Sequence, residues 1–178
     1  MDRPQPRVRP VSRRARGAVA SSLVPLALLA LLAGCGRGGV DVDSPALVDP
    51  ELSEADRATC TELLDDLPDD LAGLEPAEVD PPDALARAWG EGLAVVCGVP
   101  VPAELEPAAE CDVVAGVAWF VPPSQRDEGS DLIATAVETA PRVALVVPAE
   151  YRGQVAFDAF GELAAPVLSH FETTERCA

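Results

Sequence analysis

Lysine is absent from this chain: all 13 basic residues are arginines, set against 30 aspartates and glutamates, and the formal net charge is −17. A surface with such an excess of negative charge repels the phosphates of nucleic acids and the headgroups of anionic lipids. We therefore expect no nucleic-acid partner and no basic patch that would hold the chain on a membrane.

Residues typical of catalytic and metal centres are scarce. His170 is the single histidine, and neither a Cys-x-x-Cys pair nor a Gly-x-Ser-x-Gly segment occurs. A zinc site, a thioredoxin-like redox pair and a hydrolase nucleophile are therefore not indicated, and we expect no cofactor. Ser169 is the sequence neighbour of His170, so on a helix the two side chains point apart. We interpret His170 as a helix-end residue near backbone carbonyls.

Carboxylates are numerous enough to supply the acid pair of a glycosidase, and that alternative stays open. However, no pair is marked by its sequence context, and two tryptophans offer little surface for stacking against sugars. Our interpretation is that the chain is not an enzyme.

The N-terminal segment has the layout of a bacterial lipoprotein signal. Six arginines precede an apolar run over residues 18–33, and Leu32-Ala33-Gly34-Cys35 places small residues before a cysteine. The layout predicts cleavage before Cys35 and diacylation of its thiol. Two acyl chains hold a protein stably on a bilayer, so we expect lipid anchoring at the extracytoplasmic face of the cell membrane.

Two alternatives concern the same segment. The apolar run could be a plain transmembrane anchor, although it is short of the roughly 20 residues that a spanning helix needs. Ser12-Arg13-Arg14 is compatible with twin-arginine export in place of the general secretory (Sec) route. However, Ala15 and Arg16 follow where an aromatic residue is usual.

The signal divides the chain into three parts: a signal peptide over residues 1–34, a flexible tether over 35–50, and a single α+β domain over 51–178. Cleavage would leave 144 of the 178 residues, enough for one domain with a core. The removed segment holds six arginines and one aspartate, so the exported part carries 7 basic and 29 acidic side chains, a net charge of −22.

Four cysteines remain besides the lipid-carrying Cys35: Cys60, Cys97, Cys111 and Cys177. Outside the cytoplasm an even number of cysteines favours disulfides, and four cysteines allow three pairings. Each disulfide would close a long loop and contribute roughly 3 to 4 kcal/mol in the chain-entropy model.

Two helices are predicted from hydrophobic periodicity. Ser53 is a candidate N-cap for a helix over residues 54–67, which carries Cys60 inward. A second helix over residues 152–171 follows from a repeat of apolar side chains, and Pro166 should kink it or split off its last turn. The repeat consists of Phe157, Phe160, Ala164, Val167 and Phe171.

Strands are expected at residues 84–89, 93–97, 113–121, 132–138 and 142–147. The segment 113–121 is apolar on both faces and should be a central strand. A short gap joins the last two strands, which should form a hairpin. The predicted fold is α+β, a small antiparallel sheet of three to five strands flanked by an N-terminal and a C-terminal helix.

Several residues are candidates for a site. Asp65, Asp66, Asp69 and Asp70 crowd the end of the first helix. They could bind calcium, but their spacing does not match an EF-hand loop, so a solvated acidic surface is favoured. Trp119 is expected in the core, with the lining of a ligand pocket as the alternative. The polar loop 122–130 is a candidate contact site.

A set of short segments carries a family resemblance: Cys60 with Leu64 and Leu67-Pro68, then Ala88-Trp89-Gly90, Cys97-Gly98-Val99-Pro100, Val117-Ala118-Trp119 and Val147-Pro148-Ala149-Glu150-Tyr151. In these segments the chain resembles a family of actinobacterial lipoproteins, domain of unknown function 3515. Arginine often precedes the Cys-Gly pair in that family, where this chain has Val96. The resemblance implies that Cys60 pairs with Cys97 and Cys111 with Cys177, and it implies no activity.

The expected function is that of a non-enzymatic interaction or structural module whose partner is an envelope protein. The alternative is a small-ligand-binding lipoprotein that assists an envelope or transport system. Solute-binding proteins usually close two domains around a ligand, whereas this length provides one. An exposed apolar patch would favour a protein partner, and a concave pocket would favour a ligand.

Overall fold

The computed structural model describes residues 39–49, 51–127, 129–171 and 177. The expected signal peptide, Cys35 and the first residues of the expected tether lie outside the described residues. The elements are β1 (Val40–Asp41), α1 (Glu54–Asp66), β2 (Pro76–Ala77), β3 (Val79–Asp80), β4 (Ala86–Trp89), β5 (Leu93–Cys97), β6 (Asp112–Val114), β7 (Val117–Phe120), η1 (Pro123–Gln125), β8 (Leu132–Ala136), β9 (Val143–Val147), η2 (Ala149–Tyr151) and α2 (Gln154–His170).

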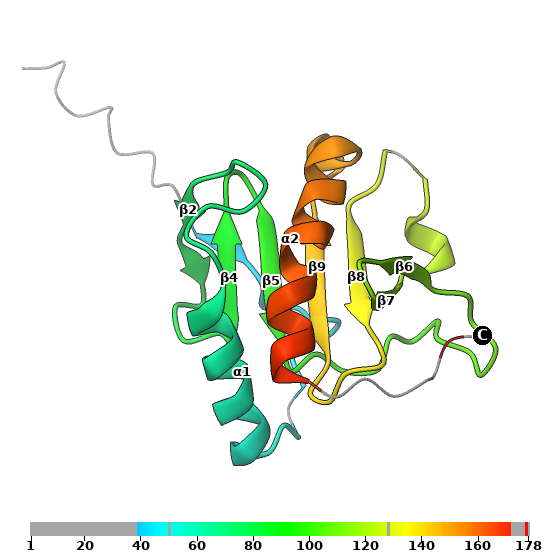
Figure 1. Cartoon of the computed structure of the whole chain (residues 1–178), viewed down its shortest axis with the longest axis horizontal. Coiled ribbons are helices and arrows are strands. Elements are labelled where there is room, and N and C mark those ends of the chain that lie inside the picture. The colour runs from blue at the N-terminus through cyan, green and yellow to red at the C-terminus, as the bar shows by residue number, and fades with distance from the viewer. Residues whose placement is uncertain (1–38, 50, 128, 172–176, 178) are drawn as a thin grey trace, which may run out of the picture. The chain divides into compact units, whose positions relative to one another are not determined.

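Seven strands form one sheet in the order β2-β4-β5-β9-β8-β7-β6, and each neighbouring pair is antiparallel. The short strands β1 and β3 pair in parallel as a separate ribbon. Both helices lie on the same face of the large sheet (Figure 1). The α+β class and the antiparallel sheet are confirmed. The predicted size of three to five strands is too small, because the two-residue β2 has no periodicity to detect and one predicted strand is in fact two.

That strand is the segment 113–121, which forms a hairpin at one edge of the sheet instead of a central strand. Strands β6 and β7 pair around Ala115 and Gly116, whose φ angles are 48° and 91°. Two consecutive residues with positive φ make the tight turn typical of two-residue hairpins, and glycine adopts this conformation readily. The unbroken apolar pattern concealed the turn. Val113 belongs to the edge strand and is 69% exposed.

The central strands β5 and β9 are buried on both faces, so the sheet needs a cover on each side. On the helical face, Leu93, Val95 and Cys97 belong to the main core. On the other face, Ala94 and Val96 pack in a second cluster that includes Val42 and Leu47. Residues 39–49 therefore pack against the domain, and the prediction of a flexible tether is wrong for them. Small side chains on the second face of the sheet leave room for this segment.

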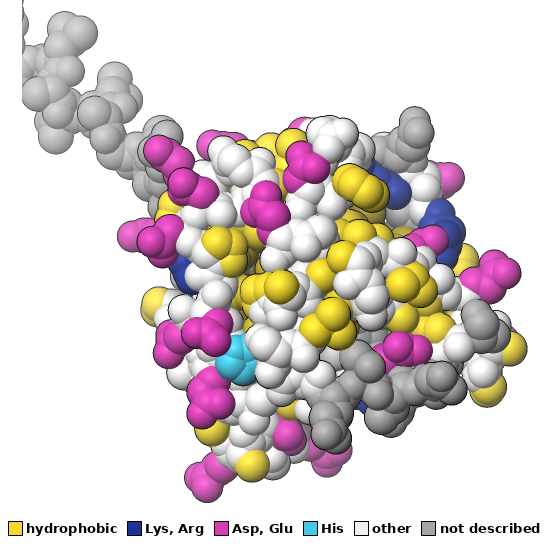
Figure 2. Space-filling view, in the orientation of Figure 1, with side chains coloured by type: hydrophobic (Ala, Val, Ile, Leu, Met, Phe, Trp, Pro, Cys, Tyr) yellow, Lys and Arg dark blue, Asp and Glu magenta, His cyan; other side chains and the backbone are white. Residues whose placement is uncertain are grey.

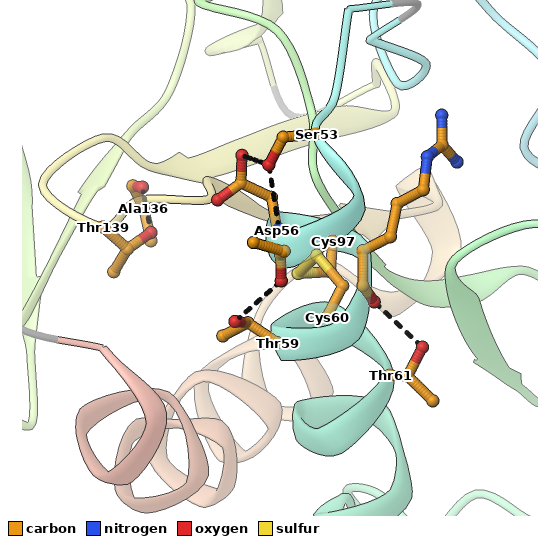
Figure 3. Close-up of a disulfide and its surroundings, with 10 residues drawn as sticks. Ser53, Asp56, Thr59, Cys60, Thr61, Cys97, Ala136 and Thr139 are labelled. Atoms are coloured by element: carbon orange, nitrogen blue, oxygen red, sulfur yellow. Dashed lines mark hydrogen bonds between the residues drawn. A yellow bond between two sulfur atoms is a disulfide. The ribbon is translucent and has the colours of Figure 1, made fainter.

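Helix α1 begins as predicted and is fastened to the sheet. The Ser53 Oγ accepts a hydrogen bond from the Asp56 backbone N–H at 3.1 Å, which caps the helix. Cys60, fully buried on α1, forms a disulfide with Cys97 of β5 (Figure 3). A second disulfide joins Cys111, just before β6, to Cys177. These are the two pairs that the family resemblance implied.

Helix α2 packs largely through the predicted face, since Ala164, Val167 and Phe171 of the apolar repeat are buried and Phe160 packs against the core. Its buried residues are Ala156, Ala159, Leu163, Ala164 and Val167. Phe157, which the apolar repeat placed on the core face, is 62% exposed. The helix continues through Pro166 to His170. Within the described ranges, no helix combines the length and the apolar composition that crossing a bilayer requires.

The Cys60–Cys97 disulfide should contribute strongly to stability, because it closes a loop with a sequence separation of 37. The double substitution Cys60→Ala and Cys97→Ala is expected to lower the free energy of unfolding by about 3 to 4 kcal/mol in the chain-entropy model. Urea denaturation of the exported chain measures this loss. The chain with Cys111→Ala and Cys177→Ala is the control that keeps the first disulfide. An unchanged urea midpoint in the Cys60 and Cys97 variant would contradict the assignment.

Candidate binding site

The helical layer is narrower than the sheet that it covers. Seven strands about 4.8 Å apart span roughly 30 Å. Two helices packed side by side, with axes about 10 Å apart, cover roughly 20 Å. Helix α1 is held over the β4–β5 end by its disulfide, and α2 lies beside it (Figure 1). The β6–β7 end of the sheet is therefore only partly covered.

A pocket of about 350 Å³ opens at this end, between the start of α2, the β6–β7 hairpin and the loop that follows β7. Its volume falls in the range of small-molecule sites. Of its eleven lining residues, seven are apolar, three are charged and one is a glycine.

An aromatic wall forms one side of the pocket. Trp119 of β7 and Phe160 of α2 have ring centroids 5.0 Å apart and planes tilted by 59°, a favourable arrangement for aromatic pairs. Phe157 also lines the pocket from the solvent side. Trp119 is 1% exposed, so its predicted place in the core is confirmed, and it lines the pocket as well.

The indole N–H of Trp119 is a buried donor with no hydrogen-bond partner among the described residues. Trp89, by contrast, donates its Nε1–H to the Asp69 carbonyl at 2.8 Å. Leaving a buried donor unpaired costs about 1 to 3 kcal/mol. Trp119 therefore brings an unsatisfied donor to the wall of the pocket.

Two arginines lie at the pocket and have different roles. Arg126 forms an ion pair of 3.6 Å with Asp112 and keeps 48% of its side chain exposed. Arg152 donates to four backbone carbonyls, at 3.1 Å to Gln125, 2.9 Å to Ser130 and 3.3 Å to Arg126, and also to Asp127. Arg152 therefore fixes the loop that we predicted as an exposed contact segment.

The N-terminus of α2 forms another part of the pocket. Gly153 lines the pocket with φ 97° and ψ −128°, a conformation that favours glycine. Among the described residues, no side chain caps the helix there. The first N–H groups of a helix lack intrahelical partners and carry partial positive charge. This end of the pocket is therefore positively polarised.

The other predicted site residues lie away from this pocket. His170 is the last residue of α2, as predicted, and its Nε2 lies 2.8 Å from Asp66 Oδ2, so it joins the ends of the two helices. Asp69 forms an ion pair of 3.4 Å with Arg87. In the part of the chain that the structure describes, no three His, Cys, Asp or Glu side chains gather as metal ligands would.

Two other hollows are larger, at about 780 and 710 Å³, but they lack this chemistry. The first is lined by β1, β2 and the turn at residues 90–92, including four carboxylates. The second is lined mainly by the loop at residues 103–110. Trp119 lines neither. We therefore regard the pocket beside Trp119 as the candidate site.

These features define a braced α+β domain with an apolar pocket where its helical layer ends. The family model described as "Protein of unknown function (DUF3515)" matches residues 19–175, and the chain belongs to this family. The match confirms the resemblance to domain of unknown function 3515 that the sequence segments indicated. No curated protein and no solved structure matches the chain.

The contacts of Arg152 predict a local effect. Arg152→Gln removes most of the donors that hold the loop after β7, so its amides should exchange hydrogen faster and the domain should lose about 1 to 3 kcal/mol of stability. Hydrogen–deuterium exchange of residues 123–131, followed by mass spectrometry, measures the first effect. Arg57→Gln, at an exposed position of α1, is the matched control and should change neither quantity. Unaltered exchange in Arg152→Gln would show that the loop is held by other contacts.

Proposed function

We propose that the chain is a lipoprotein, anchored through acylated Cys35 at the extracytoplasmic face of the cell membrane, whose domain is a non-enzymatic interaction module for an envelope protein. The small residues that precede the cysteine in the segment Leu32–Cys35 support the anchor. The two disulfides support an oxidising location, because disulfides persist outside the cytoplasm.

The observation that carries the interaction role is an apolar stripe along α2, formed by Phe157, Phe160, Gly161 and Leu168. Phe157 and Leu168 are 62% and 42% exposed and lie three helical turns apart on one side of the helix. Gly161, between them, has open space where a side chain would be. Figure 2 shows hydrophobic side chains gathered over α2 and toward the β6–β7 hairpin. Exposed apolar surface of this kind is typical of interaction sites.

The charge around the stripe specifies the chemistry of the partner. Asp158, the chain neighbour of Phe157 on α2, is exposed, and the exported part is strongly acidic overall. Complementary potentials guide the association of proteins and exclude wrong partners. We therefore expect a protein partner with an apolar patch rimmed by basic residues. The same acidity argues against a nucleic-acid partner.

The alternative function, a small-ligand-binding lipoprotein, is favoured by the pocket beside Trp119. The two roles would use adjoining surfaces, because Phe157 and Phe160 belong to both the stripe and the pocket. They are separable by experiment, because Leu168 belongs to the stripe and does not line the pocket.

Position-specific photo-cross-linking in intact cells tests the interaction role. A photoreactive amino acid at Leu168 should yield one reproducible adduct with an envelope protein, and adding Phe157→Asp should abolish it. Val101, an exposed apolar residue away from α2, is the matched control position. The same adduct from both positions, or none from Leu168, would refute the proposal.

Acylation has its own test. Cys35→Ala should leave the precursor uncleaved and without incorporated lipid, because the thiol that accepts the acyl chains is gone. Metabolic labelling with an alkyne fatty acid, followed by membrane fractionation and mass determination, measures lipid and cleavage together. Cys111→Ala is the control and should keep the label. Labelling of Cys35→Ala at the wild-type level would exclude Cys35 as the anchor.

A further inference from the structure

We propose that the pocket beside Trp119 binds a small organic monocarboxylate with an apolar body, the size of a phenylalkanoic acid or a medium-chain fatty acid. This inference goes beyond the interaction role proposed above and does not rest on it. Its basis is an open pocket whose lining combines an apolar wall, a tryptophan with a buried unpartnered N–H, and local positive charge.

The apolar walls specify most of the ligand. Seven of the eleven lining residues are apolar, and they include Trp119, Phe157 and Phe160. Ligand sites in proteins are mostly apolar, with a few polar groups that fix the orientation. At about 350 Å³, the pocket suits a compact body of this kind.

The donors specify the polar end of the ligand. The Trp119 Nε1–H has no partner among the described residues, and the uncapped N-terminus of α2 offers further N–H groups. Both kinds of group donate hydrogen bonds, so the polar end of the ligand must be a hydrogen-bond acceptor. Carboxylates are favoured at helix N-termini because the partial charge there is positive.

The charged residues that line the pocket favour a ligand with a single negative charge. Arg126 and Arg152 line the pocket with Asp112, which gives a local charge of +1 in a strongly acidic protein. Arg152 is committed to the loop carbonyls, so Arg126 is the cation that faces a ligand. Asp112 repels an anion and competes for Arg126 at 3.6 Å, and it limits the affinity.

The two tryptophans provide an internal control for detecting the ligand. The chain has two indole N–H groups, one unpartnered at the pocket and one bonded to Asp69. Titration of the exported chain carrying Cys35→Ser with 4-phenylbutanoate and with decanoate is followed by the indole ¹H–¹⁵N resonances. The Trp119 resonance should shift saturably with at least one acid, and the Trp89 resonance should stay in place. The two probes show whether the site prefers an aromatic or an aliphatic acid.

A neutral ligand and substituted forms of the protein test how much the charge of the ligand contributes to binding. The alcohol 4-phenylbutan-1-ol should bind about tenfold more weakly than the acid, since a hydrogen bond to a charged group contributes more than a neutral one. Arg126→Gln should weaken acid binding by a similar factor, and Asp112→Asn should strengthen it. Arg57→Gln is the matched control for the arginine, and Leu168→Ala is the control for Phe157→Ala, which should weaken every probe.

Three results would overturn the proposal. The first is a Trp119 resonance that does not move with any probe at millimolar concentration. The second is equal affinity for the acid and the alcohol. The third is a parallel shift of both indole resonances, which would mean binding elsewhere or loss of structure. The gain expected from Asp112→Asn cannot arise from a failure to fold. None of these results bears on the cross-link at Leu168, so the two proposals fail separately.

Discussion

A sheet that is apolar on both faces must be covered on both sides, and the rest of the structure depends on how this chain does it. Strands β5 and β9 have no polar face, so neither side can stay in water. The segment that carries Val42 and Leu47 covers one side, and two helices cover the other. Because two helices are narrower than seven strands, the cover ends at the β6–β7 hairpin, where Phe160 of α2 packs on Trp119 of β7 and Val113 of β6 stays exposed. The pocket and the exposed stripe of α2 both lie at that end.

The placement of the cover is set by covalent bonds as well as by packing. The Cys60–Cys97 disulfide holds α1 over β5, and α2 packs beside α1. The Cys111–Cys177 disulfide holds the chain just before β6, where the edge strand begins. Arg152 then fixes the loop after β7 through its carbonyls. These bonds restrain the chain around the open end, and restraint of this kind reduces the entropy cost of binding.

The sequence predicted the parts that depend on local pattern and missed those that depend on tertiary contacts. Helix α1 with its Ser53 cap, strand β5 and the β8–β9 hairpin follow from capping, turns and periodicity. The β6–β7 turn interrupts an apolar run without a polar residue, so periodicity could not locate it. The burial of Val42 depends on the far face of a sheet formed later in the chain. Trp119 was recognisable as a residue of the core or a pocket. Arg152 was not, because its carbonyl partners adjoin it only in the folded chain.

The central claim is that the β6–β7 end of the sheet and the exposed side of α2 together form the binding surface of the domain. The most direct test is hydrogen–deuterium exchange of the native protein in its own membranes, compared with the purified exported chain. The account predicts added protection in residues 112–121 and 154–168, and none in residues 76–89 at the opposite edge. Protection confined to residues 76–89, or equal across the domain, would contradict it.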